Sequence, residues 1–144
     1  MFDLKHIAGI FVLVTALIGV SATLVAVADV NSAPAASAVP DEAAIKRGKL
    51  MFLQCRACHE VAAGQPHKVG PNLRGFMGRR AAHAEGFVYS DALSASALVW
   101  DPTTLDRWIK HPESVVPGTT MAFVGIENPT DRRALIAYLE SVTR

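Results

Sequence analysis

Apolar residues divide the chain into an uninterrupted N-terminal run and a longer part in which they alternate with polar residues. From residue 7 to residue 28 no side chain is charged. About 20 such residues suffice for a helix to cross a bilayer. A secretory signal peptide is the other interpretation, because Ala26-Val27-Ala28 is a small-x-small cleavage site. We therefore expect residues 1–28 to be a signal-anchor transmembrane helix or a cleaved signal peptide, and the rest of the chain to be exported.

The apolar run is followed by a short segment and then by a sequence with globular character. Residues 29–40 read DVNSAPAASAVP, which is small, polar and proline-containing. Such a composition has little to bury and is typical of a flexible linker. We expect residues 41–144 to form a single domain.

The first helix of this domain is predicted to begin at Asp41. Acidic side chains at Asp41 and Glu42 suit the first turn of a helix, where the macrodipole favours them. Apolar residues then follow on one face as far as Phe52. Gly48 lies in mid-helix, where glycine costs about 1 kcal/mol relative to alanine. The close approach of another helix would explain it.

Two further helices and one short helix have recognisable boundaries. Asp101 followed by proline predicts a helix that ends before Pro112. The last helix is predicted to begin near Thr130, as its cap, and to carry an apolar stripe to Val142. Ser90 is predicted to cap a short helix that ends near residue 97. Between residues 60 and 100 no segment has the convincing alternation of a strand.

Glycine and proline punctuate a long irregular stretch between residues 60 and 100. A loop of this length is unusual in a compact domain. A large apolar cofactor would resolve the difficulty, because loops could pack on it instead of on one another.

The candidate chemistry is concentrated in Cys55-Arg56-Ala57-Cys58-His59, which holds both cysteines of the chain. The pattern C-x-x-C-H is that of c-type haem attachment, with two thioether bonds and a histidine beneath the iron. A redox dithiol, half of a zinc site and a structural disulfide are alternatives. The dithiol would need a βαβ context. Zinc would need more ligands at close spacing, and His67 and His83 do not have it.

Charge excludes one class of partner. The chain has 14 basic and 13 acidic residues, a formal net charge of +1. No strong positive field therefore favours nucleic acid.

Residues 41–144 resemble the class I cytochromes c of the mitochondrial type and their bacterial relatives. The matching segments are CRACH, HKVGPNLRGFMGR, GFVYSDAL, Trp100, VPGTTMAFVGI and RRALIAYL. The resemblance implies an all-α cytochrome c fold. Three main helices, short helices and long loops would surround one haem c, which is covalently attached through Cys55 and Cys58. One residue is missing before Cys55, and residues 1–40 are not covered.

The resemblance also implies the axial ligands of the iron. His59 would be the proximal ligand, and the carbonyl of Pro71 would accept a hydrogen bond from its other ring nitrogen. Met121 would be the sixth ligand, and a His/Met pair raises the reduction potential. Phe123 would cover the haem edge. Leu93 stands where the family usually has an amide side chain.

The remaining implied site residues surround the haem propionates and the methionine. Arg79, Tyr89 and Trp100 occupy the positions that hold the buried propionate, and Thr119 is expected near a propionate. Trp108 replaces the usual tyrosine beside the methionine ligand.

Other contacts are expected to be structural. Gly48 and Phe52 would meet Leu135 and Tyr138 where the first and last helices cross. His67 is expected to donate to a loop carbonyl, whereas His83 and His111 are expected to be exposed.

The implied function is one-electron transfer and not catalysis, because an iron with both axial positions filled cannot readily bind dioxygen or peroxide. The resemblance implies transfer from a cytochrome bc-type complex to a terminal cytochrome oxidase, with no small-molecule substrate. An acceptor for a periplasmic dehydrogenase and a bound subunit of a respiratory complex are alternatives within electron transfer. A peroxidase would need Met121 to be absent or labile.

The expected docking face has few positive charges. The family carries a ring of lysines around the haem edge, but here Glu113, Thr120 and Glu127 replace lysines while Lys49 and Lys68 remain. Electrostatic steering should be weak. A membrane tether through residues 7–28 would supply the missing effective concentration. The expected location is the periplasmic face of the bacterial inner membrane, or the soluble periplasm if residues 1–28 are cleaved.

Overall fold

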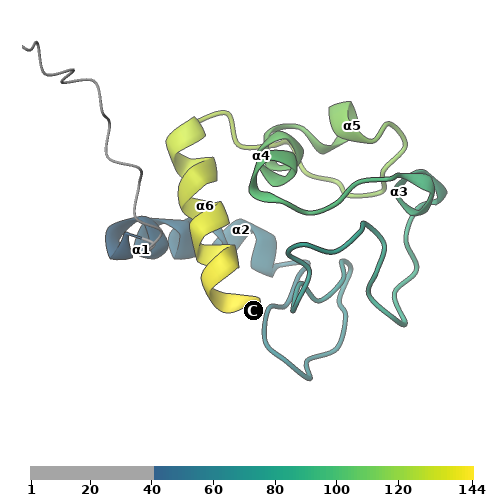
Figure 1. Ribbon diagram of the computed structural model, residues 1–144, viewed down its shortest axis with the longest axis horizontal. Helices are drawn as coiled ribbons and strands as arrows, with labels where there is room; N and C mark the ends of the chain where they lie inside the picture. The colour runs from purple at the N-terminus through teal and green to yellow at the C-terminus, as the bar shows by residue number, and fades with distance from the viewer. Residues whose placement is uncertain (1–40) are drawn as a thin grey trace, which may run out of the picture. The chain divides into compact units, whose positions relative to one another are not determined.

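The computed structural model describes residues 41–144, so the predicted anchor or signal peptide and the linker lie outside the described residues. Six helices occur in the described part (Figure 1). They are α1 (Glu42–Met51), α2 (Leu53–Arg56), α3 (Asp91–Ala95), α4 (Pro102–Lys110), α5 (Pro112–Val115) and α6 (Pro129–Val142). Within residues 41–144 no strand forms, apart from one isolated antiparallel bridge between Arg80 and Val99. The all-α prediction is therefore confirmed for this part of the chain.

None of these helices combines the length and the apolar character that membrane crossing requires.

Helices α1 and α6 pack across each other, as the mid-helix glycine predicts (Figure 1). Gly48 is buried directly against the backbone carbonyl of Ala134. One turn further along, the rings of Phe52 and Tyr138 lie 5.4 Å apart between centroids. Leu135, which is 1% exposed, belongs to the same core. The crossing fastens the two ends of the domain together and brings α6 to the start of the haem motif.

The helix boundaries follow the predicted caps with one correction. Asp101 accepts a hydrogen bond from the amide of Thr104 at 2.7 Å, and Ser90 accepts one from Leu93 at 3.2 Å. The predicted cap of the last helix, Thr130, is wrong, because Asn128 accepts the first amide hydrogen bond of α6. Proline at the first helical position has no amide proton to be capped, which places the cap on the residue before it.

Two short elements differ from the prediction. Helix α3 ends at Ala95, before the expected residue 97. Helix α5 was not predicted, and His111 caps it by accepting a hydrogen bond from the amide of Ser114. Pro112 therefore stops α4 and also opens a new helical turn, in keeping with the preference of proline for the first position.

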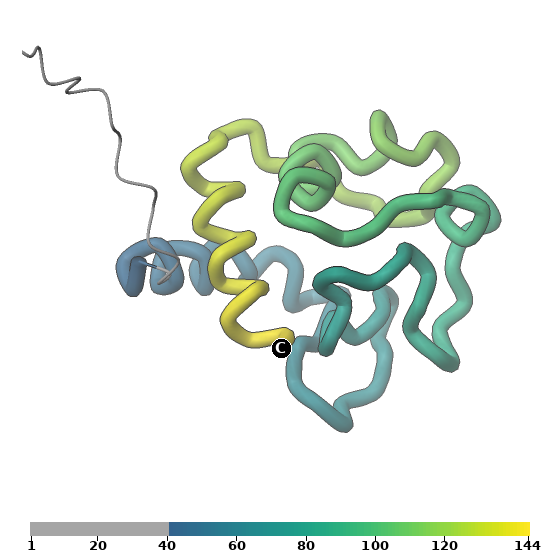
Figure 2. Tube along the Cα trace, viewed as in Figure 1, coloured from purple at the N-terminus to yellow at the C-terminus, as the bar shows by residue number. Residues whose placement is uncertain are grey.

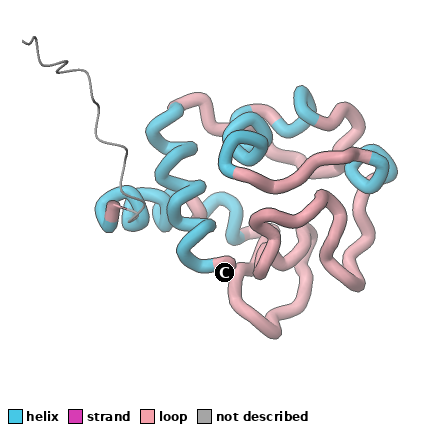
Figure 3. The backbone as a smooth tube through the Cα atoms, viewed as in Figure 1, coloured by secondary structure: helices cyan, strands magenta, loops and turns pink. Residues whose placement is uncertain are grey.

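The segment between α2 and α3, which Figure 3 shows to be mostly loop, is held in place by hydrogen bonds to the haem motif. The amide of Gly70 donates to the carbonyl of Cys58 at 2.8 Å, and the amide of Leu73 donates to Glu60 at 2.7 Å. Asn72 adds three hydrogen bonds within this segment, to the carbonyls of Ala62 and Gln65 and from the amide of Arg74. The loop is therefore fixed although it has no regular secondary structure.

A buried arginine joins α4, α6 and the segment that precedes α6. Arg132 is 7% exposed, and its Nε and Nη2 atoms contact the Asp106 carboxylate at 2.8 and 3.2 Å. Its Nη1 atom donates to the carbonyls of Ile126 and Glu127 at 2.9 and 2.8 Å. The tube in Figure 2 shows this segment running from the C-terminal end of α5 to the start of α6. Arg132 satisfies its charge and its donors together, as a buried guanidinium must.

The glycine at the helix crossing provides a stability test. A β-carbon at position 48 would collide with the Ala134 carbonyl and lie 2.7 Å from the Cβ atom of Tyr138. We expect Gly48→Val to lower the free energy of unfolding of the holoprotein by roughly 3 kcal/mol, because the backbone of α6 has to move. Denaturant unfolding followed by haem absorption measures the change.

Lys49→Val is the matched control, because Lys49 is the exposed neighbour on α1. It introduces the same β-branched side chain and should cost only about 0.7 kcal/mol through helix propensity. Equal losses in the two variants would contradict the importance of the crossing.

Candidate haem-binding site

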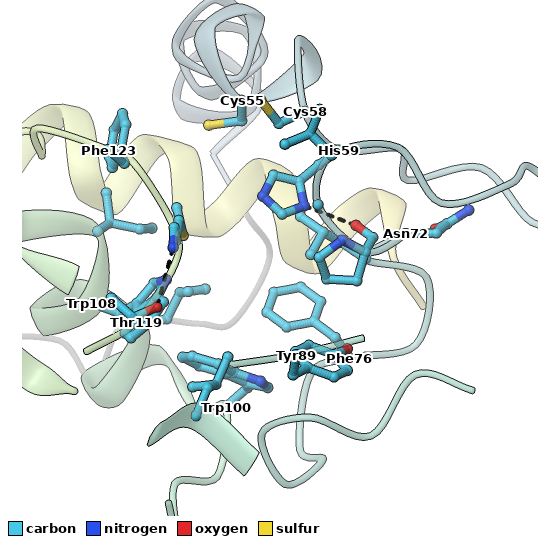
Figure 4. A pocket seen from close by; sticks show the side chains of 18 of the residues that line it. Cys55, Cys58, His59, Asn72, Phe76, Tyr89, Trp100, Trp108, Thr119 and Phe123 are labelled. Carbon is cyan, nitrogen blue, oxygen red and sulfur yellow. Dashed lines mark hydrogen bonds between the residues drawn. The ribbon is translucent and has the colours of Figure 1, made fainter. Parts of the chain in front are cut away.

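The functional residues converge on one largely apolar cavity (Figure 4). Its walls come from the haem motif, the loop that follows it, helices α3, α4 and α6, and the segment around Met121. Figure 4 shows Cys55 and Cys58 at one end and Tyr89 and Trp100 at the other. Of the residues implied to contact haem, those that line the cavity are Cys55, Cys58, His59, Pro71, Tyr89, Trp100, Trp108, Thr119, Met121 and Phe123.

His59 is held in a single orientation. Its Nδ1 atom donates to the carbonyl of Pro71 at 2.8 Å, which leaves Nε2 as the free ring nitrogen. Gly70 packs directly on the imidazole ring, so that a β-carbon there would overlap it. Burial lowers the pKa of His59, the nearby Lys68 cation lowers it further, and the Pro71 carbonyl opposes both effects. A neutral imidazole with one fixed nitrogen is the form that binds metal.

No disulfide joins Cys55 and Cys58, and both line the cavity. Burial, together with the neighbouring Cys58, raises the pKa of Cys55 to about 11. A reactive redox dithiol needs a lowered thiol pKa, so this environment argues against that alternative. Among the described residues no group of three or more histidine, cysteine or acidic side chains is placed to hold a metal ion. The donor set therefore fits thioether attachment of a haem with His59 beside it.

The opposite wall is formed by the segment around Met121, which is half-buried. The hydroxyl oxygen of Thr119 accepts a hydrogen bond from the Met121 amide at 3.3 Å. Behind it Trp108 is buried and packs edge-to-face on Trp100, with ring centroids 5.2 Å apart. Thr119 thus shapes the turn that carries the thioether, in addition to lining the cavity.

The end of the cavity away from the cysteines is amphipathic. Trp100 is buried against Phe76, and the hydroxyl of Tyr89 accepts a hydrogen bond from the Ala84 amide at 3.3 Å. Burial raises the pKa of Tyr89, against the effect of that amide. The phenol therefore keeps its proton at neutral pH and remains able to donate it.

Arg79 is the one implied haem contact that the structure does not bring to the cavity lining. Its side chain is exposed and borders a second, smaller recess. Asn72 and His83 line both spaces, so the two adjoin. Its predicted role as a propionate partner stays a prediction.

The predictions for His67, His83 and His111 are partly confirmed. His67 donates from Nε2 to the carbonyl of Glu85 at 2.8 Å, which confirms the predicted loop contact, and His111 is exposed. The predicted exposure of His83 is wrong, because its ring is half-buried in the cavity wall. The neighbouring residues Ala81, Ala82 and Ala84 are too small to have signalled a buried segment by their hydrophobic pattern.

Several cavity residues carried no functional signal in the sequence. Phe76, from the glycine-rich loop, is 4% exposed and supports Trp100. The others are apolar helix residues whose periodicity indicated only a core: Leu105, Ile109, Leu135 and Leu139. They face the cavity because a cofactor takes the place of a protein core there.

Known proteins with related sequences support the same cofactor. The family model for cytochrome c matches residues 45–143. Cytochrome c2 of Rhodomicrobium vannielii is 45% identical over 93 residues, which cover 65% of this chain and 74% of that protein. Cytochrome c2 of Rhodoblastus acidophilus is 47% identical over 92 residues, covering 64% and 86%. Cytochrome c of Kluyveromyces lactis is 41% identical over 95 residues, covering 65% and 86%.

A solved structure shows the same fold. Cytochrome cH from Methylobacterium extorquens superposes with a TM-score of 0.64 at 40% sequence identity. The comparison covers 67% of this chain and 97% of that one. Proteins of this family bind one covalent haem c and transfer electrons; they are not enzymes. The match extends over most of residues 41–144 and includes both cysteines. This chain therefore belongs to the cytochrome c family and is an electron-transfer protein that carries one haem c attached through Cys55 and Cys58.

Proposed function

We propose that the chain is a respiratory one-electron carrier in which His59 and Met121 hold the haem iron from opposite sides. It passes electrons from a cytochrome bc-type complex to a terminal cytochrome oxidase. The observation that carries the proposal is the placement of both side chains in the wall of one cavity, on segments that are separately fixed. When bound, the haem supplies an iron that alternates between Fe(III) and Fe(II).

The proximal side supports this assignment through the state of His59. The Nδ1–H group of His59 donates to the carbonyl of Pro71, and the lowered pKa of His59 keeps the ring neutral. Nε2 is then the atom available to the metal. A hydrogen bond to a carbonyl increases the basicity of a ligating imidazole.

The distal side supports electron transfer over peroxidase chemistry. Met121 offers a soft, neutral sulfur, which raises the reduction potential by favouring the reduced metal. Among the described residues that line the cavity there is no carboxylate to act as a general acid or base. Two positions that lie close to Met121 are threonines, Thr119 and Thr120, whose hydroxyls do not titrate near neutrality.

Partner docking would rest on short-range contact. Val69 lines the cavity and is 84% exposed, and Val124, next to Phe123, is 90% exposed. The cation of Lys68 is paired with Glu60 at 2.5 Å. A rim with exposed valines and a paired lysine provides little long-range attraction, so association would depend on concentration and contact area.

A tether would provide that concentration. The uncharged run over residues 7–28 is long enough to anchor the domain on the periplasmic face of the inner membrane. Confining a carrier near its membrane-bound partners replaces a bimolecular search by an intramolecular one.

Replacing the sulfur ligand tests the axial assignment. Met121→Ala should keep the covalent haem but lose the weak red absorption band of sulfur-bound ferric haem. Its potential should fall by at least ~0.1 V, part of the ~0.8 V range that axial ligands span. Spectroscopy and a redox titration measure both effects. Met77→Ala is the control, because Met77 is half-buried and lies outside the cavity lining. An unchanged band in Met121→Ala would refute the ligand assignment.

Crowding the proximal ring tests the role of His59. Gly70→Ala places a methyl group against the imidazole, so we expect a shifted ferric spectrum and a loss of roughly 2 kcal/mol of stability. In the control, Gly64→Ala, the added methyl group meets open space but the backbone φ is +74°. It should lose about 1 kcal/mol through strain, with an unaltered spectrum. Identical spectra for Gly70→Ala and the unmodified protein would contradict the close packing of Gly70 on the ligand ring.

Fractionation of the native organism or an expression host tests the tether. The holoprotein should stay with the membranes after a high-salt wash and be released by mild detergent. N-terminal sequencing should then find residues 7–28 still attached. Recovery of a form that begins near Asp29 in the soluble periplasm would exclude the anchor.

A further inference from the structure

One polar atom in the cavity wall has no partner. Nδ1 of His83 is fully shielded from solvent and makes no hydrogen bond within residues 41–144. The backbone carbonyl of Arg80 lies near enough to favour protonation of the ring, but it forms no hydrogen bond of acceptable geometry with Nδ1. Buried polar atoms nearly always have partners, so an unpaired one inside a cofactor cavity points to a group on the cofactor.

The position of His83 indicates which group this is. It lines the main cavity and also the recess bordered by Arg79. The next residue, Ala84, donates to the hydroxyl of Tyr89, which lies at the end of the cavity opposite the cysteines (Figure 4). In haem the two propionates lie on the opposite side of the ring from the vinyl groups, which the cysteines bind. The propionates therefore point toward the end of the cavity where His83 lies.

We propose that His83 is a hydrogen-bond partner of a haem propionate and that its protonation is coupled to the oxidation state of the iron, which makes the reduction potential depend on pH. The inference rests on haem c in this cavity and does not require Met121 to be the sixth ligand.

The groups around His83 are compatible with a proton that titrates near neutrality. Burial lowers the pKa of His83 and the Arg79 cation lowers it further. A propionate anion beside the ring would act in the opposite direction, because an opposite charge favours the protonated form. The pKa should then return toward the ordinary histidine value of about 6.5.

Apart from His83 itself and the proposed haem-binding residues Cys55, Cys58 and His59, few charged or titratable groups line the two cavities. They are Arg74, Arg79, Glu85 and His67 in the recess, and Tyr89 in the main cavity. His67 has both ring nitrogens engaged, with the Asn72 amide and the Glu85 carbonyl. Tyr89 titrates well above neutrality. Among these groups His83 is the histidine with a free buried nitrogen, which makes it the best placed to exchange a proton when the iron changes charge.

The direction of the pH dependence follows from charge. Reduction lowers the positive charge of the iron by one, so a protonated His83 stabilises the reduced state and its pKa is higher in that state. The potential should be high and constant at low pH. It should fall as the pH rises through the two pKa values, and become constant again above both.

The effect should be moderate in size, because the charges are separated within a protein of intermediate permittivity. We expect the proton affinity of His83 to differ about threefold to tenfold between the two oxidation states. A tenfold difference corresponds to about 59 mV for a one-electron couple.

Redox titration of the holoprotein between about pH 5 and 9 tests the coupling. The unmodified protein should show the fall in potential near the histidine range. His83→Gln keeps a polar side chain but cannot titrate, and should give a potential that is constant across that range. His111→Asn is the matched control, because His111 is an exposed helix cap and asparagine also caps helices. This variant should retain the fall.

A second measurement does not depend on the variant folding well. The ring protons of His83, followed by NMR in the unmodified holoprotein, should titrate with a higher pKa in the ferrous than in the ferric state. A histidine with a purely structural role would titrate identically in both.

The proposal is overturned if the potential does not change with pH, if the fall persists in His83→Gln, or if the NMR pKa is the same in both states. The red absorption band, recorded on the same samples, reports sulfur ligation independently. Loss of that band with the pH dependence intact would refute the proposed axial ligand and leave the role of His83 standing.

Discussion

The structure depends most on how the imidazole of His59 is fixed. A hydrogen bond of 2.8 Å to the Pro71 carbonyl sets its tautomer, and the absence of a side chain at Gly70 lets the backbone rest against the ring. The Gly70 amide in turn bonds to the carbonyl of Cys58, one residue before the histidine. Two neighbouring loop residues therefore control the position, protonation and orientation of one ring.

The methionine side of the cavity is built independently and at long range. Ile126 donates from its amide to the carbonyl of Ile109 in α4 at 3.0 Å, and Gly125 lies directly against the Lys110 carbonyl with φ +98°. Arg132 binds the carbonyls that follow, while its charge is matched by Asp106. The α1–α6 crossing adjoins the same cavity, because Phe52, Leu135 and Leu139 contribute to its lining.

The features that depend on short-range sequence rules could be predicted. The haem motif, the helix caps at Asp101 and Ser90 and the need for glycine at position 48 all follow from short-range chemistry, and the structure agrees. The cap at Asn128 also follows from a local rule, because proline at the first helical position places the cap on the residue before it, so the wrong prediction of Thr130 was avoidable. Arg79 and His83 lie in a loop without periodicity, so neither the exposure of the one nor the burial of the other could be predicted. The burial of Arg132 could not be predicted from local sequence, because its partners are 26 residues upstream and on the backbone.

The titratable groups at the two ends of the cavity have different roles. Near the attachment point no group titrates close to neutrality, because the sulfurs of Cys55 and Cys58 become thioethers when the haem is attached, and the pKa of His59 is below its usual value. The opposite end holds Tyr89, a neutral donor, and His83, whose nitrogen is shielded but unpaired. A fixed protonation state around the metal keeps reorganisation during electron transfer small. The proposed adjustment of the potential by His83 would act at this opposite end of the cavity, through charge alone, and would leave the ligand geometry unchanged.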